Sequence, residues 1–257
     1  MKKLFLTFFV ALTVIALHAR QTPSQASDPV QQRQIKVLSL NNSLIDYNEQ
    51  SEIYNAIANS KGVDAKWDKR TQLGKSLIYH FNDPLARQLV ASQPWDYIIL
   101  QDMSNLPRAF PDVFVQSVKL WKLYILENCP NKDVVVILPM NWAYSTEWDT
   151  FGQETAKLRH AYETASREMP GVKVAYVGAA YETILNEKGR DYAAKLYSDN
   201  RHSTMLATYL AALIEIGMTT DIDPADIDYV PEGIDKADAE YIRDVASRSL
   251  ALRRVAN

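Results

Sequence analysis

The sequence has few cysteines, histidines and glycines, and it has no run of basic residues. Its single cysteine, Cys129, cannot form an intramolecular disulfide, so we expect it to lie in the core as a small hydrophobic residue. Four histidines and one cysteine are too few for a dedicated transition-metal site, and we expect no metal. Lys and Arg number 28 against 31 Asp and Glu, without a block of five or six basic residues, so we expect no nucleic-acid partner.

Three common signatures are also absent. The sequence contains no Gly-x-Gly-x-x-Gly, no His-Glu-x-x-His and no Gly-x-Ser-x-Gly, which removes the motif evidence for dinucleotide binding, zinc peptidases and α/β-hydrolases. What remains is the composition of an ordinary globular protein, with 47% hydrophobic and 23% charged residues in 257. A chain of this kind can bury a sizeable core, and we expect one domain.

The longest apolar run lies at the N-terminus. It extends from Leu4 to Leu17 after Met1-Lys2-Lys3, and it is shorter than the roughly 20 residues of a membrane-spanning helix. With the small residue Ala19 after it, the run predicts a signal peptide over residues 1–19, and therefore an exported protein without a stable membrane span after processing. An uncleaved anchor is the alternative. Residues 20–34 are polar and predict a flexible tether.

Strands and helices are predicted to alternate along the rest of the chain. Apolar runs of strand length, rich in Val, Ile or Tyr, occur at 35–40, 97–100, 134–138 and 172–177, with a weaker run at 63–67. Segments with helical spacing occur at 50–60, 85–92, 113–127, 153–167, 179–186, 205–217 and 235–253. This order predicts a three-layer α/β/α, doubly wound domain over residues 35–257, with a mostly parallel, five-stranded sheet.

In such a sheet, functional residues are expected on the loops after the carboxyl ends of the strands. The first predicted strand runs directly into Asn41-Asn42-Ser43-Leu44. A serine at this strand-to-helix turn would lie exposed, close to backbone N–H groups that can stabilise an oxyanion. The same residues could also form no more than a polar turn.

A second polar segment precedes the predicted helix at 205–217. Asp199 lies three residues before His202, so its carboxylate can fold back to the imidazole and orient it as a general base. Alternatively, Asp199 is a turn residue and His202 is solvated.

Four short blocks, taken in order, make the sequence resemble the SGNH, or GDSL-like, hydrolases, in particular their exported bacterial branch. The blocks are Asn41-Asn42-Ser43-Leu44, Gly74-Lys75-Ser76-Leu77 with His80 shortly after, the segment 95–104 with Gln101, and the segment 202–212. They span residues 35 to about 217. Two family glycines are replaced, by Asn41 and Ala207, and the added side chains are expected to crowd the turn and the last helix.

The resemblance implies a flavodoxin-like fold and a serine ester hydrolase that needs no cofactor. Ser43 would be the nucleophile, His202 the base and Asp199 the residue that orients it. The N–H groups of Ser43 and Gly74, with the side-chain amide of Gln101, would form the oxyanion hole. Gln101 stands in for an asparagine that this sequence lacks, and it could instead be a buried link to a neighbouring loop. The implied substrate is a carbohydrate ester, with acetyl as the commonest acyl group. The implied location of the protein itself is the bacterial periplasm or the cell surface.

An aromatic segment follows the fourth predicted strand, and its flat rings and polar groups suit a sugar. We expect substrate contacts from six residues: Asn42, His80, Asn141, Trp142, Tyr144 and Trp148. The alternative is that Trp142 and Trp148 close the core and that His80 is a structural histidine.

Two other functions remain open. The lost glycines and the missing asparagine would also fit a glycan-binding protein without catalysis. A partner-docking domain is the second, because the helix at 235–253 carries Ile242, Val245, Leu250 and Leu252, which could face a partner. The sequence does not determine the oligomeric state.

Overall fold

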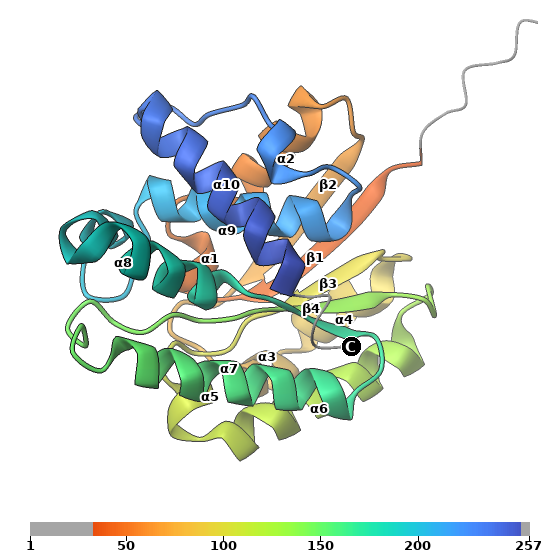
Figure 1. The fold of residues 1–257 in the computed structure, drawn as a ribbon. Helices are drawn as coiled ribbons and strands as arrows, with labels where there is room; N and C mark the ends of the chain where they lie inside the picture. The colour runs from red at the N-terminus through yellow and green to blue at the C-terminus, as the bar shows by residue number, and fades with distance from the viewer. Residues whose placement is uncertain (1–32, 253–257) are drawn as a thin grey trace, which may run out of the picture. The chain divides into compact units, whose positions relative to one another are not determined.

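A computed structural model describes residues 33–252, which form a single parallel sheet covered by helices (Figure 1). The strand order is β2-β1-β3-β4-β5, and every pairing is parallel. The strands are β1 (Ile35–Asn41), β2 (Ala65–Thr71), β3 (Tyr97–Leu100), β4 (Val135–Pro139) and β5 (Val172–Ala175). The predicted α/β/α fold with a five-stranded sheet is confirmed. The predicted signal peptide, and the tether up to residue 32, lie outside the described residues.

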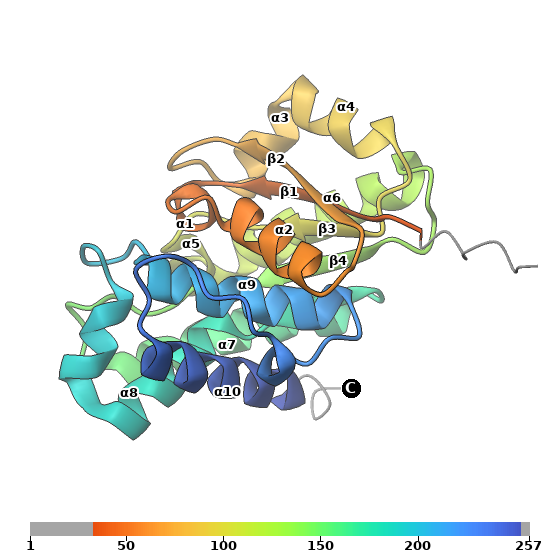
Figure 2. The same cartoon turned by 90° about the horizontal axis from the view of Figure 1, so that it is seen from above.

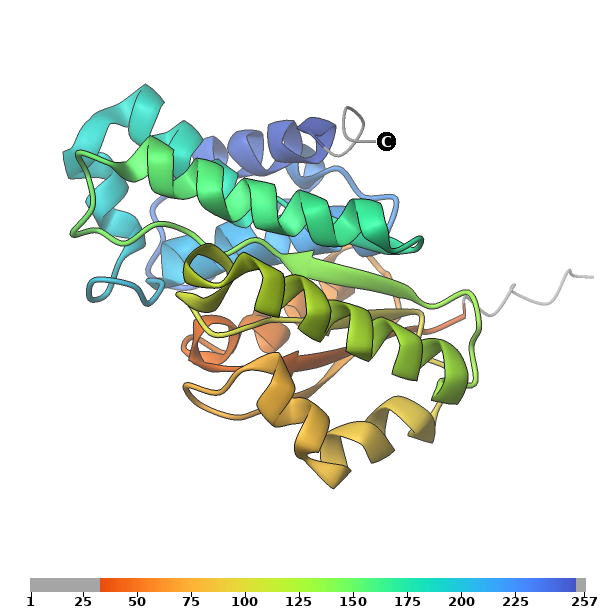
Figure 3. The ribbon, with the colours of Figure 1, turned by 90° about the horizontal axis from the view of Figure 1, so that it is seen from below.

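Helices cover both faces of the sheet. The α-helices are α1 (Ser43–Asp46), α2 (Gln50–Ser60), α3 (Leu77–Asn82), α4 (Pro84–Ser92), α5 (Leu106–Ala109), α6 (Pro111–Asn128), α7 (Phe151–Glu168), α8 (Val177–Ala193), α9 (Met205–Thr219) and α10 (Lys236–Leu252). Helices α2 and α9 lie on one face, with α10 outside α9 (Figure 2). Helices α6 and α7 cover the other face, with α3 and α4 beside α6 (Figure 3).

Two hydrophobic cores follow from this layering, one on each side of the sheet. Helix α9 is buried from Leu206 to Thr219 because it lies between the sheet and α10. Ile242 and Val245 of α10 are fully buried in that core, and only Leu252, at the end of the helix, is exposed. The apolar face of α10 is therefore used inside this chain, and the argument for a partner-docking helix is wrong. Cys129 is buried and free, as expected.

The structure differs from the predicted elements where pairing or short turns decide the outcome. Strand β2 begins two residues later than the apolar run and continues through Asp68, Lys69 and Arg70. This charged half still forms a strand because it pairs with β1 and lies at the edge of the sheet, where Lys69 binds Asp46 and Arg70 binds Asp83. The four-residue helices α1 and α5 and the six-residue α3 were not predicted, since so short a segment shows no apolar period. No helix of residues 33–252 is long and apolar enough to cross a membrane.

Candidate active site

A cleft of about 390 Å³ lies at the carboxyl ends of the strands. Its walls come from the loop after each of the first four strands and from the segment before α9. The lining residues are Asn42, Ser43 and Leu44 after β1, Gly74 after β2, Met103, Ser104 and Asn105 after β3, Tyr144 after β4, and Arg201 and His202 before α9. The cleft therefore lies where ligands bind in open parallel sheets.

Ser43, His202 and Asp199 are joined by hydrogen bonds across this cleft. Ser43 is the first residue of α1, and its Oγ lies 3.0 Å from Nε2 of His202. Nδ1 of His202 lies 2.7 Å from Oδ2 of Asp199. The structure thus brings together residues that are 159 positions apart in the sequence, in the order that a nucleophile, a base and an orienting carboxylate require.

Asp199 and His202 belong to a short hairpin, residues 197–203, which we call the His202 hairpin. It is closed by an antiparallel bridge between Tyr197 and Ser203. Oδ1 of Asp199 accepts the backbone N–H groups of Arg201 and His202, both at 2.8 Å, while Oδ2 faces the imidazole. Partial burial opposes ionisation of Asp199, but the hydrogen bonds from the His202 ring and from the two N–H groups outweigh it and lower its pKa to about 2. Asp199 is therefore a carboxylate at any pH at which His202 can act as a base.

Two residues of the α1–α2 turn support the imidazole, and the sequence analysis missed both. The ring of Tyr47 is stacked on His202, with a centroid distance of 4.8 Å and an interplanar angle of 13°. Nδ2 of Asn48 donates to the carbonyl oxygen of Ser203 at 2.8 Å and to the hydroxyl of Thr208 at 2.9 Å. Tyr47 lies four residues after Ser43, a spacing that places both on one side of a helical turn and that could have indicated the contact.

Two backbone N–H groups at the cleft are unpaired. Neither the N–H of Ser43 nor that of Gly74 has an acceptor among the described residues. Asn42 holds the two loops together, because its Nδ2 donates to the carbonyl oxygens of Lys75 and Asp102, both at 3.1 Å, while its Oδ1 accepts the N–H of Leu44. Gly74 has a φ of +67°, which favours glycine over residues with a side chain. The arrangement provides two free donors beside Ser43.

The sequence matches no family model and no curated protein, but solved structures share its fold. A DUF4886 family protein from Bacteroides uniformis superposes with a TM-score of 0.73 at 18% identity, over 85% of this chain and 95% of that one. A protein assigned to the SGNH hydrolases from Slackia heliotrinireducens has a TM-score of 0.60 at 20% identity, over 73% and 99%. The chain has the SGNH hydrolase fold. A family 3 carbohydrate esterase from Clostridium thermocellum also shares it, with a TM-score of 0.53 at 11% identity, over 72% and 94%.

In this SGNH fold, Gln101 lies next to the Ser43 turn but outside the cleft lining. It is 1% exposed, and its Oε1 accepts the N–H of Asn42 at 3.4 Å. The buried link considered above is therefore present, while its Nε2 has no partner among the described residues and stays available as a donor. Asn105 is a second candidate, because it lines the cleft and its Oδ1 accepts from Nε of Arg108 at 2.6 Å, which leaves its Nδ2 free.

Of the six residues expected to contact substrate, Asn42 and Tyr144 line the cleft, and the others do not. His80 is fully buried and its Nε2 donates to the carbonyl oxygen of Asn41 at 2.9 Å, so it is a structural histidine whose pKa burial lowers. Asn141 is buried, and its Nδ2 lies 3.3 Å from the carbonyl oxygen of Ser104. The expectation of substrate contact is wrong for both.

The two tryptophans of the aromatic segment also belong to the scaffold. Trp142 is 6% exposed and stacks on Tyr181, and its Nε1 donates to the carbonyl oxygen of Arg201 at 2.8 Å. Trp148 stacks on Phe151 and packs against the core. The alternative reading, that they close the core, is the one the structure supports. Trp142 has a further effect, because its hydrogen bond holds the His202 hairpin against the loop after β4.

Asp102 is a buried carboxyl group that fixes the segment between Gly74 and α3, and no sequence motif pointed to it. It is fully buried, and its Oδ1 accepts the N–H of Leu77 at 3.1 Å and that of Met103 at 2.7 Å. Burial raises the pKa of Asp102 to about 6, against the opposing effect of these hydrogen bonds. Because Leu77 begins α3, this carboxyl group ties the segment after Gly74 to the end of β3.

The residues that replace the two glycines are both buried, and neither has a positive φ. Asn41 is buried at the end of β1, where its Oδ1 accepts from the hydroxyl of Thr71 at 2.7 Å. Its φ is not positive, since Glu49 is the only non-glycine residue with positive φ in the described part of the chain. Ala207 is fully buried in α9. The Ser43 turn therefore needs no glycine at position 41.

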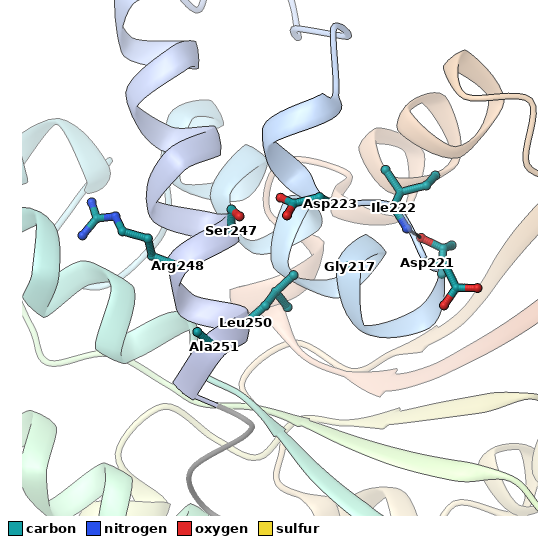
Figure 4. A pocket seen from close by; sticks show the side chains of 9 residues that line it. Gly217, Asp221, Ile222, Asp223, Ser247, Arg248, Leu250 and Ala251 are labelled. Carbon is teal, nitrogen blue, oxygen red and sulfur yellow. Dashed lines mark hydrogen bonds between the residues drawn. The ribbon is translucent and has the colours of Figure 1, made fainter.

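A second cavity, of about 490 Å³, lies between the end of α9, the loop after it and α10 (Figure 4). No predicted site residue lines it. Arg248 and Asp221 point to opposite sides of it in the figure, and Arg248 is engaged by Glu187 and Asp244. Within residues 33–252, no group of three or more His, Cys, Asp and Glu side chains is placed to hold a metal ion. Ser43, His202 and Asp199 do not line this cavity, and Ser43 and His202 line the cleft described above.

Proposed function

We propose that this protein is a serine ester hydrolase that removes a small acyl group, with acetyl the first choice, from a carbohydrate. The observation that carries the proposal is the hydrogen-bonded series from Ser43 Oγ through His202 to Asp199 at the edge of the cleft. A serine and a histidine in this contact, with the second ring nitrogen held by a carboxylate, can carry out acyl transfer.

In the proposed reaction, Nε2 of His202 takes the proton of Ser43 as Oγ attacks the acyl carbon. The tetrahedral intermediate collapses when the bond to the alcohol oxygen breaks, and His202 returns the proton to that oxygen. Water then attacks the acyl-serine with the same proton transfers, so one ester and one water become one carboxylic acid and one alcohol. Asp199 stays ionised throughout, since its pKa is lowered to about 2, and it stabilises the protonated imidazole.

The negative charge of the intermediate needs donors that are already in place. The unpaired N–H groups of Ser43 and Gly74 line the cleft and fit this role, with the side-chain amide of Gln101 as a third donor. Asn42 and Asp102 hold these loops by hydrogen bonds to main-chain groups, so the donors need not reorganise during the reaction.

The small, polar cleft supports a short acyl group on a polar alcohol. Asn, Ser, Tyr, Arg and His side chains form most of its lining, and Leu44 and Met103 are the apolar exceptions. The buried tryptophans give no support to a carbohydrate. That part of the proposal is supported by the shared fold with a carbohydrate esterase and by the polarity of the cleft.

The test is a panel of p-nitrophenyl esters of increasing acyl length together with acetylated sugars. We expect turnover that is highest for acetyl and that falls by several orders of magnitude in Ser43→Ala. Ser92→Ala, on the exposed end of α4, serves as the matched control and should keep full activity. Equal rates in wild type and Ser43→Ala would refute Ser43 as the nucleophile, and a wild-type protein that hydrolyses no ester would favour a glycan-binding protein.

A further inference from the structure

The lining of the cleft includes a cationic side chain next to the proposed nucleophile. Among its lining residues Arg201 is the one with a permanent charge, and no aspartate or glutamate is present. The chain as a whole is acidic, with a formal net charge of −3, so general basicity does not explain an arginine here. Arg201 directly precedes His202 and is exposed.

The guanidinium of Arg201 is also unpaired. Every other arginine among residues 33–252 binds a side chain or a carbonyl oxygen. The side chain of Arg201 has no such partner in the described part of the chain, where only its backbone N–H and carbonyl oxygen form hydrogen bonds. A guanidinium that lies in a cleft without an intramolecular partner is available to a ligand that carries a carboxylate.

The backbone of Arg201 is held at both ends of the residue. Its N–H donates to Oδ1 of Asp199 at 2.8 Å, and its carbonyl oxygen accepts from Nε1 of the buried Trp142 at 2.8 Å. The position from which the side chain extends is therefore fixed relative to His202. A substrate group bound by this guanidinium would be placed at a set distance from the reacting ester.

We propose that Arg201 selects an ester whose alcohol part carries an anionic group, and specifically the carboxylate of an acidic sugar. This inference rests on the proposed function and names the substrate class of the same site. A planar carboxylate can accept two parallel hydrogen bonds from a guanidinium, which gives a fixed orientation as well as attraction. The polar amides and hydroxyls of the cleft are then left for the sugar hydroxyl groups.

The test compares two acetyl esters that differ in one group, an acetylated methyl glucuronoside and the corresponding acetylated methyl glucoside. We expect wild type to have a kcat/KM about tenfold higher for the acidic ester at low salt. Arg201→Gln should remove this preference and change the kcat/KM of the neutral ester less than threefold. Arg201→Lys should keep part of it. Arg167→Gln, an exposed residue on α7 with the same loss of charge, should keep all of it.

Equal kcat/KM for the two esters in wild type, or an equal loss for both in Arg201→Gln, would overturn the role of Arg201. A third ester with a sulfate in place of the carboxylate separates the two anions, and a preference for sulfate would overturn the assignment to carboxylate. A binding measurement is independent of catalysis. Methyl glucuronoside titrated into Ser43→Ala should bind more tightly than methyl glucoside, and the added change Arg201→Gln should abolish the difference. If no ester is hydrolysed but this difference is found, the hydrolase proposal fails and the anion site stands.

Discussion

Glu215 is a carboxyl group buried where α9 packs on α2. It is fully inaccessible, its Oε2 accepts from Nε2 of Gln50 at 2.7 Å, and its Oε1 has no partner in the described residues. No lysine or arginine of that part of the chain pairs with it. Burial raises the pKa of Glu215 to about 8, although the hydrogen bond from Gln50 acts in the opposite direction.

The sign of the effect on stability follows from proton binding. Between the ordinary pKa of 4.5 and about 8, the folded chain keeps a proton on Glu215 that the unfolded chain releases. The free energy of unfolding therefore falls as the pH rises through this window, by at most about 1.4 kcal/mol per pH unit. Integration between pH 5.5 and 7.5 gives a loss of roughly 2–3 kcal/mol from this one group.

Glu215→Gln keeps the size of the side chain and removes the titration. Urea unfolding followed by circular dichroism at steps from pH 5.5 to 7.5 gives the free energy of unfolding of each protein. We expect wild type to lose roughly 2–3 kcal/mol more than the variant over this range. The comparison uses the change with pH, so a constant offset from the new amide does not affect it. Glu168→Gln, exposed at the end of α7, should follow wild type. Parallel curves for wild type and Glu215→Gln would refute the buried, protonated carboxyl.

Three further predictions concern the cleft and its supports. The variants Gln101→Ala and Asn105→Ala identify the proposed side-chain oxyanion donor. Loss of that donor should lower kcat by about 10²–10³ with little change in KM. If Gln101→Ala lowers only the melting temperature, the donor is assigned to Asn105. Gly178→Ala should destabilise the fold by about 3 kcal/mol in urea unfolding, since the new Cβ would lie 2.0 Å from a main-chain oxygen of the loop after β4; an unchanged midpoint would contradict that packing. Tyr47→Leu should lower kcat about threefold to tenfold by removing the ring stacked on His202, whereas Tyr47→Phe should not; its melting temperature should change little because Tyr47 is 54% exposed.

The sheet could be predicted because its strands are short apolar runs whose burial on both faces leaves a direct trace in the sequence. Ser43, Asp199 and His202 could be predicted chiefly from the resemblance to the SGNH hydrolases, because each local pattern alone also fitted a polar turn. Asp199 and His202 are three residues apart, so their contact depends on one turn. Ser43 follows a strand directly, and the rule that parallel strands end at one edge places it there. Their catalytic roles stay predictions until the variants are measured.

The substrate contacts could not be predicted from the same information. Tryptophan and histidine occur both in binding sites and in cores. Whether Trp142, Trp148 and His80 lie in a binding site or in the core depends on segments distant in the sequence. Trp142, for example, is covered by Tyr181 of α8. The charged half of β2 was missed because backbone pairing with β1, and not apolar character, makes Asp68–Arg70 a strand. Each of these errors has its cause in a long-range contact.

The separation of Ser43 from His202 has a consequence for when the protein becomes chemically competent. The proposed nucleophile, Ser43, is made with the first strand, whereas the proposed base and its carboxylate are made some 159 residues later, after the last strand. During synthesis the sheet can form and cover its faces in part while the serine has no partner to remove its proton. Under the proposed mechanism, His202 can activate Ser43 only after the His202 hairpin has docked against the loop after β4 and α9 has packed under α10. Ester turnover in a refolding experiment would therefore report the docking of the C-terminal third, and it should lag behind the recovery of the circular dichroism signal.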